Sequence, residues 1–136
     1  MTQEIKGSCL CGKVQFTVNG PFERFYLCHC GRCRKGTGSA HASNIFTQPE
    51  NIVWIAGEDL VKRFELPNAI RFTRAFCTHC GGPVPVAPRK GKFLVIPAGT
   101  LDEDPPLSPQ SNIFWADRAS WYEKGLVAQR FEAYPI

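Results

Sequence analysis

The seven cysteines of this 136-residue chain fall into three clusters with the spacing of metal ligands. The first cluster is Cys9-Leu10-Cys11-Gly12, and the last is Cys77-Thr78-His79-Cys80-Gly81. A glycine that follows the cysteines can take a positive φ, which lets backbone amides point at the sulfur atoms. Together the two pairs supply four thiolates, so we expect a closed structural zinc site on Cys9, Cys11, Cys77 and Cys80 that ties two distant segments.

The middle cluster, Cys28-His29-Cys30-Gly31-Arg32-Cys33, has three thiols and no fourth cysteine to complete a site. A second zinc on Cys28, Cys30 and Cys33 would keep a position open for water or substrate, which is typical of a catalytic site. His29 is an alternative fourth ligand, but the chain would have to turn back sharply for it to reach the same ion. Because three thiolates carry net negative charge, the open position favours a sulfur ligand, and a substrate thiol would bind there as a thiolate.

Three basic residues, Arg32, Arg34 and Lys35, lie beside the middle cluster. They would offset its negative charge and bind carboxylates of a substrate; the alternative is that they are solvated surface charges. His41 could support the open site as a hydrogen-bond donor or be an ordinary strand residue. We expect His79, inside the last cluster, to be exposed.

Disulfides, inert thiols and an iron–sulfur centre account for the cysteines less well than zinc does. An odd number of thiols in a chain that we expect to be cytoplasmic argues against a disulfide framework. Buried inert thiols would not fall into paired clusters followed by glycine. An iron–sulfur centre stays an alternative for the middle cluster, since three cysteines also hold iron in such centres.

The elements that position these clusters are predicted to be short strands. Residues 13–18 alternate polar and apolar side chains and place Val14, Phe16 and Val18 on one buried face. Similar runs predict strands at 43–47, 51–56, 61–66, 70–76, 82–86, 93–98 and 112–116. Eleven prolines and twelve glycines indicate frequent turns, so we predict an all-β fold.

Two segments are predicted to differ from strands. Residues 101–109 contain three prolines and should form an ordered surface loop. Residues 120–124 are predicted to form one helical turn, with Ser120 as its cap and Gly125 as its stop.

Composition limits the classes of protein to which the chain can belong. Its length and 43% hydrophobic content fit a single domain over residues 1–136, and the large aromatic residues are expected in the core or a pocket wall: Phe22, Phe25, Tyr26, Trp54, Trp115 and Trp121. The net charge of +4 is scattered, so no nucleic acid partner is expected. No stretch has the ~20 apolar residues of a membrane span, and the N-terminus has no secretory pattern, so a cytoplasmic location is expected.

With these motifs in view, the sequence resembles the glutathione-dependent formaldehyde-activating enzymes, a family whose eukaryotic relatives include centromere protein V. The resemblance runs from about Gly7 to Phe131. The residues that carry it are Gly7-Ser8-Cys9-Leu10-Cys11-Gly12, Cys28-His29-Cys30 with Cys33-Arg34-Lys35 and Gly38, Phe76-Cys77-Thr78-His79-Cys80-Gly81, Leu101-Asp102, and Asn112-Ile113-Phe114 through Trp121. Leu10 departs from the polar residue that is frequent at this position in the family, but it is not a ligand.

The resemblance implies a β-tent fold of short antiparallel sheets, a structural zinc on the outer four cysteines and a second zinc on the middle three. It also implies condensation of glutathione with formaldehyde to S-hydroxymethylglutathione, which in reverse is a carbon–sulfur lyase reaction. Our leading hypothesis is therefore a zinc-dependent carbon–sulfur lyase in which a glutathione-like thiol adds to a small aldehyde. Two alternatives are a non-catalytic, zinc-stabilised protein-binding module and a metal buffer or redox sensor.

Overall fold

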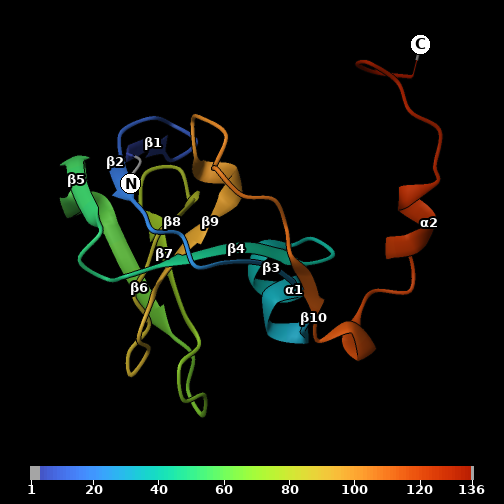
Figure 1. Ribbon diagram of the computed structural model, residues 1–136, viewed down its shortest axis with the longest axis horizontal. Coiled ribbons are helices and arrows are strands. Elements are labelled where there is room, and N and C mark those ends of the chain that lie inside the picture. The colour runs from blue at the N-terminus through green and yellow to red at the C-terminus, as the bar shows by residue number, and fades with distance from the viewer. Residues whose placement is uncertain (1–3, 136) are drawn as a thin grey trace.

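The computed structural model describes residues 4–135; residues 1–3, at the start of the N-terminal stretch, and residue 136 lie outside them. The fold is mainly β, as predicted, with three small sheets and two short α-helices in the described part (Figure 1). The first sheet has the order β1-β2-β5, from strands Glu4–Ser8, Gln15–Asn19 and Ile52–Ala56. Both of its strand pairs are antiparallel.

The second and third sheets carry most of the cysteine clusters. The order β10-β3-β4-β9 joins strands Ser111–Ile113, Arg24–Cys28, Ala42–Thr47 and Leu94–Pro97, and β3 and β10 form a parallel pair. The order β6-β7-β8 joins Val61–Glu65, Thr73–Cys77 and Pro83–Val84. The helices are α1, Gly31–Thr37, and α2, Tyr122–Leu126, and three short 3-10 turns occupy Glu58–Leu60, Ala98–Thr100 and Trp115–Asp117.

The apolar core lies between the first two sheets. Val14, Phe16 and Val18 are each 1% exposed or less, which confirms the predicted buried face. Phe16 and Val18 pack in one cluster with Ile45 and further apolar residues of the second sheet. A second buried cluster contains Val14, Cys9, Cys77 and neighbouring residues, so the first cysteine group is continuous with apolar packing.

Several predicted elements differ from the observed ones. The strands β1 and β3 and the helix α1 were not predicted. Segment 120–124 does contain helix, but α2 begins at Tyr122, has no side-chain cap and includes Gly125, so Ser120 does not cap it and Gly125 does not stop it. Segment 101–109 is a loop, as predicted, and Asp102 in it accepts a 2.9 Å hydrogen bond from the Ser8 hydroxyl.

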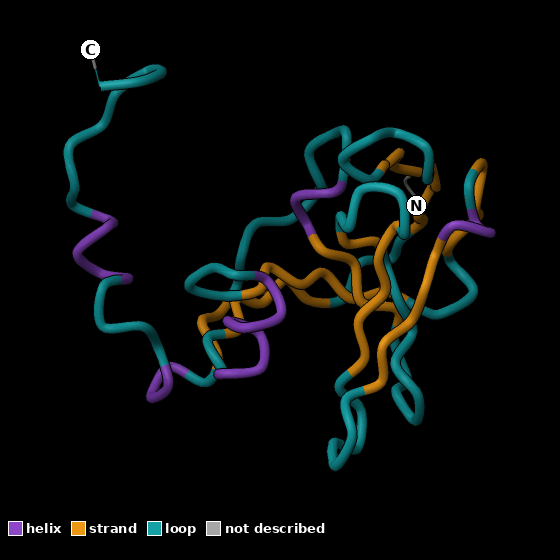
Figure 2. Tube along the Cα trace, turned by 180° about the vertical axis from the view of Figure 1, so that it is seen from behind, coloured by secondary structure: helices purple, strands orange, loops and turns teal. Residues whose placement is uncertain are grey.

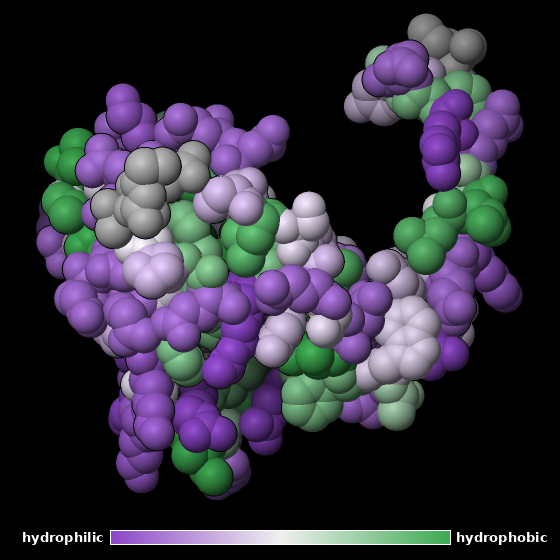
Figure 3. Space-filling model, viewed as in Figure 1, coloured by the Kyte–Doolittle hydropathy of each residue, from purple (hydrophilic) through white to green (hydrophobic). Residues whose placement is uncertain are grey.

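The C-terminal segment extends away from the sheets after Tyr122, the first residue of α2, whose ring still packs against His29 (Figures 1 and 2). Apolar side chains are exposed along this arm, among them Leu126 and Val127 (Figure 3). Trp121 is 54% exposed and Trp115 is 37% exposed, so neither is the core residue that we expected. No helix within residues 4–135 has both the length and the apolar content needed to cross a membrane.

Candidate metal centre and adjacent pocket

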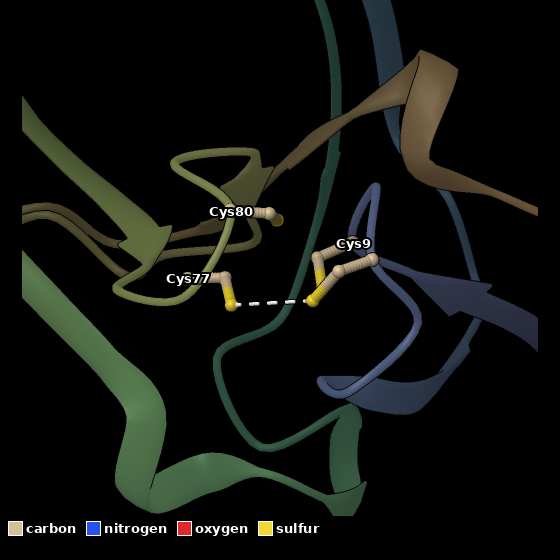
Figure 4. Close-up of side chains that lie close together, drawn as sticks. Cys9, Cys77 and Cys80 are labelled. Atoms are coloured by element: carbon tan, nitrogen blue, oxygen red, sulfur yellow. Dashed lines mark hydrogen bonds between the residues drawn. The ribbon is translucent and has the colours of Figure 1, made fainter.

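The outer four cysteines come together as the sequence predicted. The sulfur atoms of Cys9, Cys11, Cys77 and Cys80 all lie within 4.8 Å of one another. Figure 4 shows Cys77 and Cys80 at the turn after β7, facing the loop that carries Cys9. A tetrahedral zinc with Zn–S bonds of ~2.3 Å separates its sulfurs by ~3.8 Å. The Sγ–Sγ distances of 3.6 Å for Cys9–Cys11 and 3.9 Å for Cys11–Cys77 fit that geometry and are far too long for disulfides.

Backbone amides donate hydrogen bonds to these sulfur atoms, as expected for thiolates. The amide of Val14 donates to Cys9 Sγ at 3.4 Å, and the amide of Gly82 donates to Cys80 Sγ at 3.4 Å. Gly12 and Gly81, the residues directly after the second cysteine of each pair, have φ of +80° and +75°. The prediction of positive-φ glycines and amide–sulfur hydrogen bonds is therefore confirmed at both turns.

The middle three cysteines form a second group at the start of α1. The sulfurs of Cys28, Cys30 and Cys33 lie within 4.8 Å of one another, and no other His, Cys, Asp or Glu of residues 4–135 joins them. Cys28 ends β3, Cys30 caps α1 by accepting the Cys33 amide at 3.3 Å, and Cys33 points from the first turn of the helix. The end of β3, the N-cap of α1 and the first turn of α1 therefore hold the three sulfurs close together.

Hydrogen bonds among these thiols lower the pKa of some of them and raise the pKa of others. The hydrogen bond from Cys33, together with one from the Cys30 amide, lowers the pKa of Cys28 to about 6. The same contact with Cys28, and burial, raise the pKa of Cys33. In the four-cysteine group, burial raises the pKa of Cys9, but the Val14 amide and the neighbouring thiols outweigh it and bring it to about 6. Hydrogen bonds also lower the pKa of Cys80, so each group holds at least one thiol that loses its proton to a cation more easily than a free thiol does.

His29 does not complete the three-cysteine group. Its ring is fully buried, and its Nε2 donates to Asn112 Oδ1 at 2.9 Å. The ring packs against Trp115 and Tyr122 with centroid distances of 5.1 and 4.7 Å. His41 lies on the same ring at 5.0 Å, and burial lowers the pKa of His41. The two histidines therefore belong to an aromatic cluster beside the sulfurs, whereas His79 is exposed, as expected.

The basic residues beside the cluster lie on other faces of α1. Arg32 and Lys35 are exposed, and Arg34 donates from Nη1 to the Asp117 carbonyl at 3.2 Å. Their assignment to a substrate carboxylate stays a prediction.

A pocket of about 280 Å³ lies beside the three-cysteine group. Cys33, Gly36 and Thr37 of α1 form part of its wall, and Phe72 and Arg74 form another part. Sequence reasoning missed Arg74, because nothing in the run around β7 distinguishes it from the other scattered charges. The signal that identifies it is spatial: its guanidinium lies against the glycine of a helix that is remote in the sequence.

Comparisons with known proteins agree with this arrangement. Residues 4–117 match the family model described as glutathione-dependent formaldehyde-activating enzyme. A Halomonas elongata protein named "Putative glutathione-dependent formaldehyde-activating enzyme" is 29% identical over 125 residues, which are 88% of this chain and 80% of that protein. A crystal structure of a Rhodobacter sphaeroides protein shares the fold with a TM-score of 0.61 at 20% identity, covering 79% of this chain and 99% of that one. The cysteine groups and the match over most of its length show that the chain belongs to the glutathione-dependent formaldehyde-activating enzyme family.

Proposed function

We propose that the chain is a zinc-dependent carbon–sulfur lyase that joins a glutathione-like thiol to a small aldehyde such as formaldehyde. The observation that carries the proposal is the three-cysteine group beside a pocket, since a zinc held by three sulfurs would keep one position open for a substrate. Family membership and the name of the Halomonas elongata relative support the same reaction class. The four-cysteine group has a full set of ligands, so we assign it a structural zinc.

Each part of the chain has a distinct task in this proposal. Cys28, Cys30 and Cys33 hold the ion, and the pocket next to Cys33 receives the rest of the thiol. When bound, zinc lowers the pKa of a thiol at its open position. In the reaction the thiol sulfur bonds to the aldehyde carbon, the π pair of the C=O bond moves to oxygen, and oxygen gains one proton as the thiol loses one. The reverse step breaks the same carbon–sulfur bond.

Substitution of Cys30 with serine tests the proposal. Serine can still accept the Cys33 amide hydrogen bond as the helix cap, so we expect the variant to fold and to melt close to wild type. Native mass spectrometry should count two zinc ions in the wild type and one in Cys30→Ser. Exchange NMR with glutathione and formaldehyde should show exchange between free thiol and adduct that is faster than the uncatalysed background only in the wild type. The exposed Arg130 in the C-terminal arm provides a control, Arg130→Gln, that should behave as wild type in all three measurements.

An unchanged acceleration of adduct formation over the uncatalysed background in Cys30→Ser would refute the assignment of the site. A wild-type protein that holds two zinc ions but neither binds glutathione nor turns it over would favour the protein-binding module instead. Iron in the purified protein, visible by colour and by metal analysis, would refute zinc.

A further inference from the structure

The pocket beside Cys33 has the electrostatic character of an anion site. Among the described residues that line it, Arg74 is the one with a fixed charge, and no aspartate or glutamate is present. The rest of the wall is apolar or neutral, including Phe72, Val84 and the side chains of Ser43 and Asn44. A low-polarity wall strengthens the attraction between a single cation and an incoming anion. Cys33 lines the same pocket, so the Arg74 cation lies between the sulfur group and the rest of the pocket wall.

Among the described residues, no carboxylate forms an ion pair with Arg74. The residue is half-buried in β7, so its cation has lost part of its contact with water. Within residues 4–135, no hydrogen bond or ion pair to its guanidinium is present. A guanidinium offers five N–H donors in a plane that matches a carboxylate in a bidentate pair. A partly desolvated arginine with its donors free and facing a pocket is therefore prepared for such a ligand.

Gly36 allows Arg74 to reach this position. It lies inside α1, where glycine stabilises a helix less than alanine does. A Cβ at this position would approach Arg74 Nη1 to 2.7 Å and Arg74 Cδ to 2.9 Å. A side chain on residue 36 would therefore displace the guanidinium from the helix surface. The helix thus tolerates a weak helix former at the place where the arginine packs.

We propose that Arg74 binds a carboxylate of the thiol substrate and determines the selectivity of this pocket for acidic thiols. The inference rests on the proposed function, because it assumes that the three-cysteine group beside the pocket receives the sulfur of the substrate thiol. It assigns the carboxylate to β7, whereas the sequence pointed to Arg32, Arg34 and Lys35. Positions 33, 36 and 37 of α1 face the pocket, and these three basic residues are not among those that line it.

The test is calorimetric binding of three compounds to the zinc-loaded protein. Glutathione carries the thiol and the carboxylates, S-methylglutathione keeps the carboxylates but has no thiol, and glutathione diethyl ester keeps the thiol but has no free carboxylate. We expect Arg74→Gln to weaken binding of glutathione and S-methylglutathione by about 10-fold or more, because a charge-assisted hydrogen-bond pair to the carboxylate is lost. Binding of the diethyl ester should be equal in both proteins. Native mass spectrometry should show two zinc ions in the wild type and in the variant.

Three further variants separate charge from geometry. Arg71→Gln removes the same charge from an exposed side chain three positions away and should leave all three affinities unchanged. Arg74→Lys keeps the charge but loses the bidentate geometry, so its affinity should lie between those of wild type and Arg74→Gln. Gly36→Ala should weaken binding of the two carboxylate compounds, because the new Cβ displaces the guanidinium.

Each outcome bears on the inference. Equal weakening of the acids and the ester in Arg74→Gln, or no weakening at all, would overturn it, while retained glutathione binding and turnover would leave the proposed function standing. Binding of S-methylglutathione that depends on Arg74, in a protein without turnover, would support the inference and remove the proposed function. If the wild type binds neither glutathione nor S-methylglutathione, both fail.

Discussion

Replacement of Cys77 with serine should destabilise the protein much more than replacement of Cys33 with serine. Cys77 is fully buried at the end of β7, and its sulfur lies 3.9 Å from that of Cys11, a residue 66 positions away. Loss of this ligand weakens the cross-link that the four-cysteine site forms between the first and third sheets. The sulfurs of Cys28 and Cys33, in contrast, belong to residues only five positions apart, so little chain is held by them.

The magnitude follows from chain entropy. The cost of closing a loop grows as (3/2)RT ln n, so a tie across 66 positions restricts the unfolded chain by about 2 kcal/mol more than a tie across five. The serine hydroxyl at the buried position adds roughly 1–3 kcal/mol if it finds no hydrogen-bond partner. We therefore expect Cys77→Ser to lose at least about 2 kcal/mol more than Cys33→Ser. In a chain of this size that difference corresponds to a melting temperature lower by roughly 6–10 °C.

The assay is thermal and urea unfolding of the two variants and the wild type, followed by circular dichroism, with zinc counted by native mass spectrometry. Cys77→Ser should unfold early or be insoluble, and Cys33→Ser should stay folded with one zinc. A soluble Cys77→Ser protein that melts within about 2 °C of wild type would refute the reasoning. So would a Cys33→Ser protein that is equally destabilised.

Two further predictions concern single residues beside the sulfur groups. Asn112→Ala removes the partner of buried His29 Nε2, so the free energy of unfolding in urea should fall by about 1–3 kcal/mol, whereas Ser111→Ala, its exposed neighbour, should stay near wild type. Gly12→Ala should lower the free energy of unfolding by about 1 kcal/mol in the same assay, because alanine is strained at φ +80° although no neighbouring atom would clash with its Cβ. Gly31→Ala is the control, since its Cβ also meets no atom and its φ is not positive, and it should not be destabilised. Equal stability of the two alanine variants would contradict backbone strain as the cause.

The strand pattern predicted part of the fold. Residues 13–18 alternate regularly, and their buried face was correct because period-two alternation follows directly from strand geometry. β3 was missed because Arg24–Cys28 places several apolar residues together without alternation. Its backbone pairs with the parallel β10 along one edge and the antiparallel β4 along the other, and that pairing is not visible locally.

The helix α1 and the pocket show the same limit. Gly31–Thr37 contains two glycines, which are poor helix formers, so local propensity gave no reason to expect a helix. The helix forms because Cys30 caps it and because Cys33 is buried with Cys28 and Ala42. Arg74 became a candidate only when the fold brought β7 against this helix.

The sequence by itself determined which cysteines group together, because clusters that contain two or three thiols and adjacent glycines restrict how sulfur can be shared among metal sites. It also determined the β-rich class and the family, because alternation and motif spacing are local properties of the chain. Only the tertiary structure decided what surrounds the three-cysteine group: a buried histidine hydrogen-bonded to Asn112, and a pocket lined by the cation of Arg74. These contacts join residues far apart in the sequence, so they exist only after the sheets have packed.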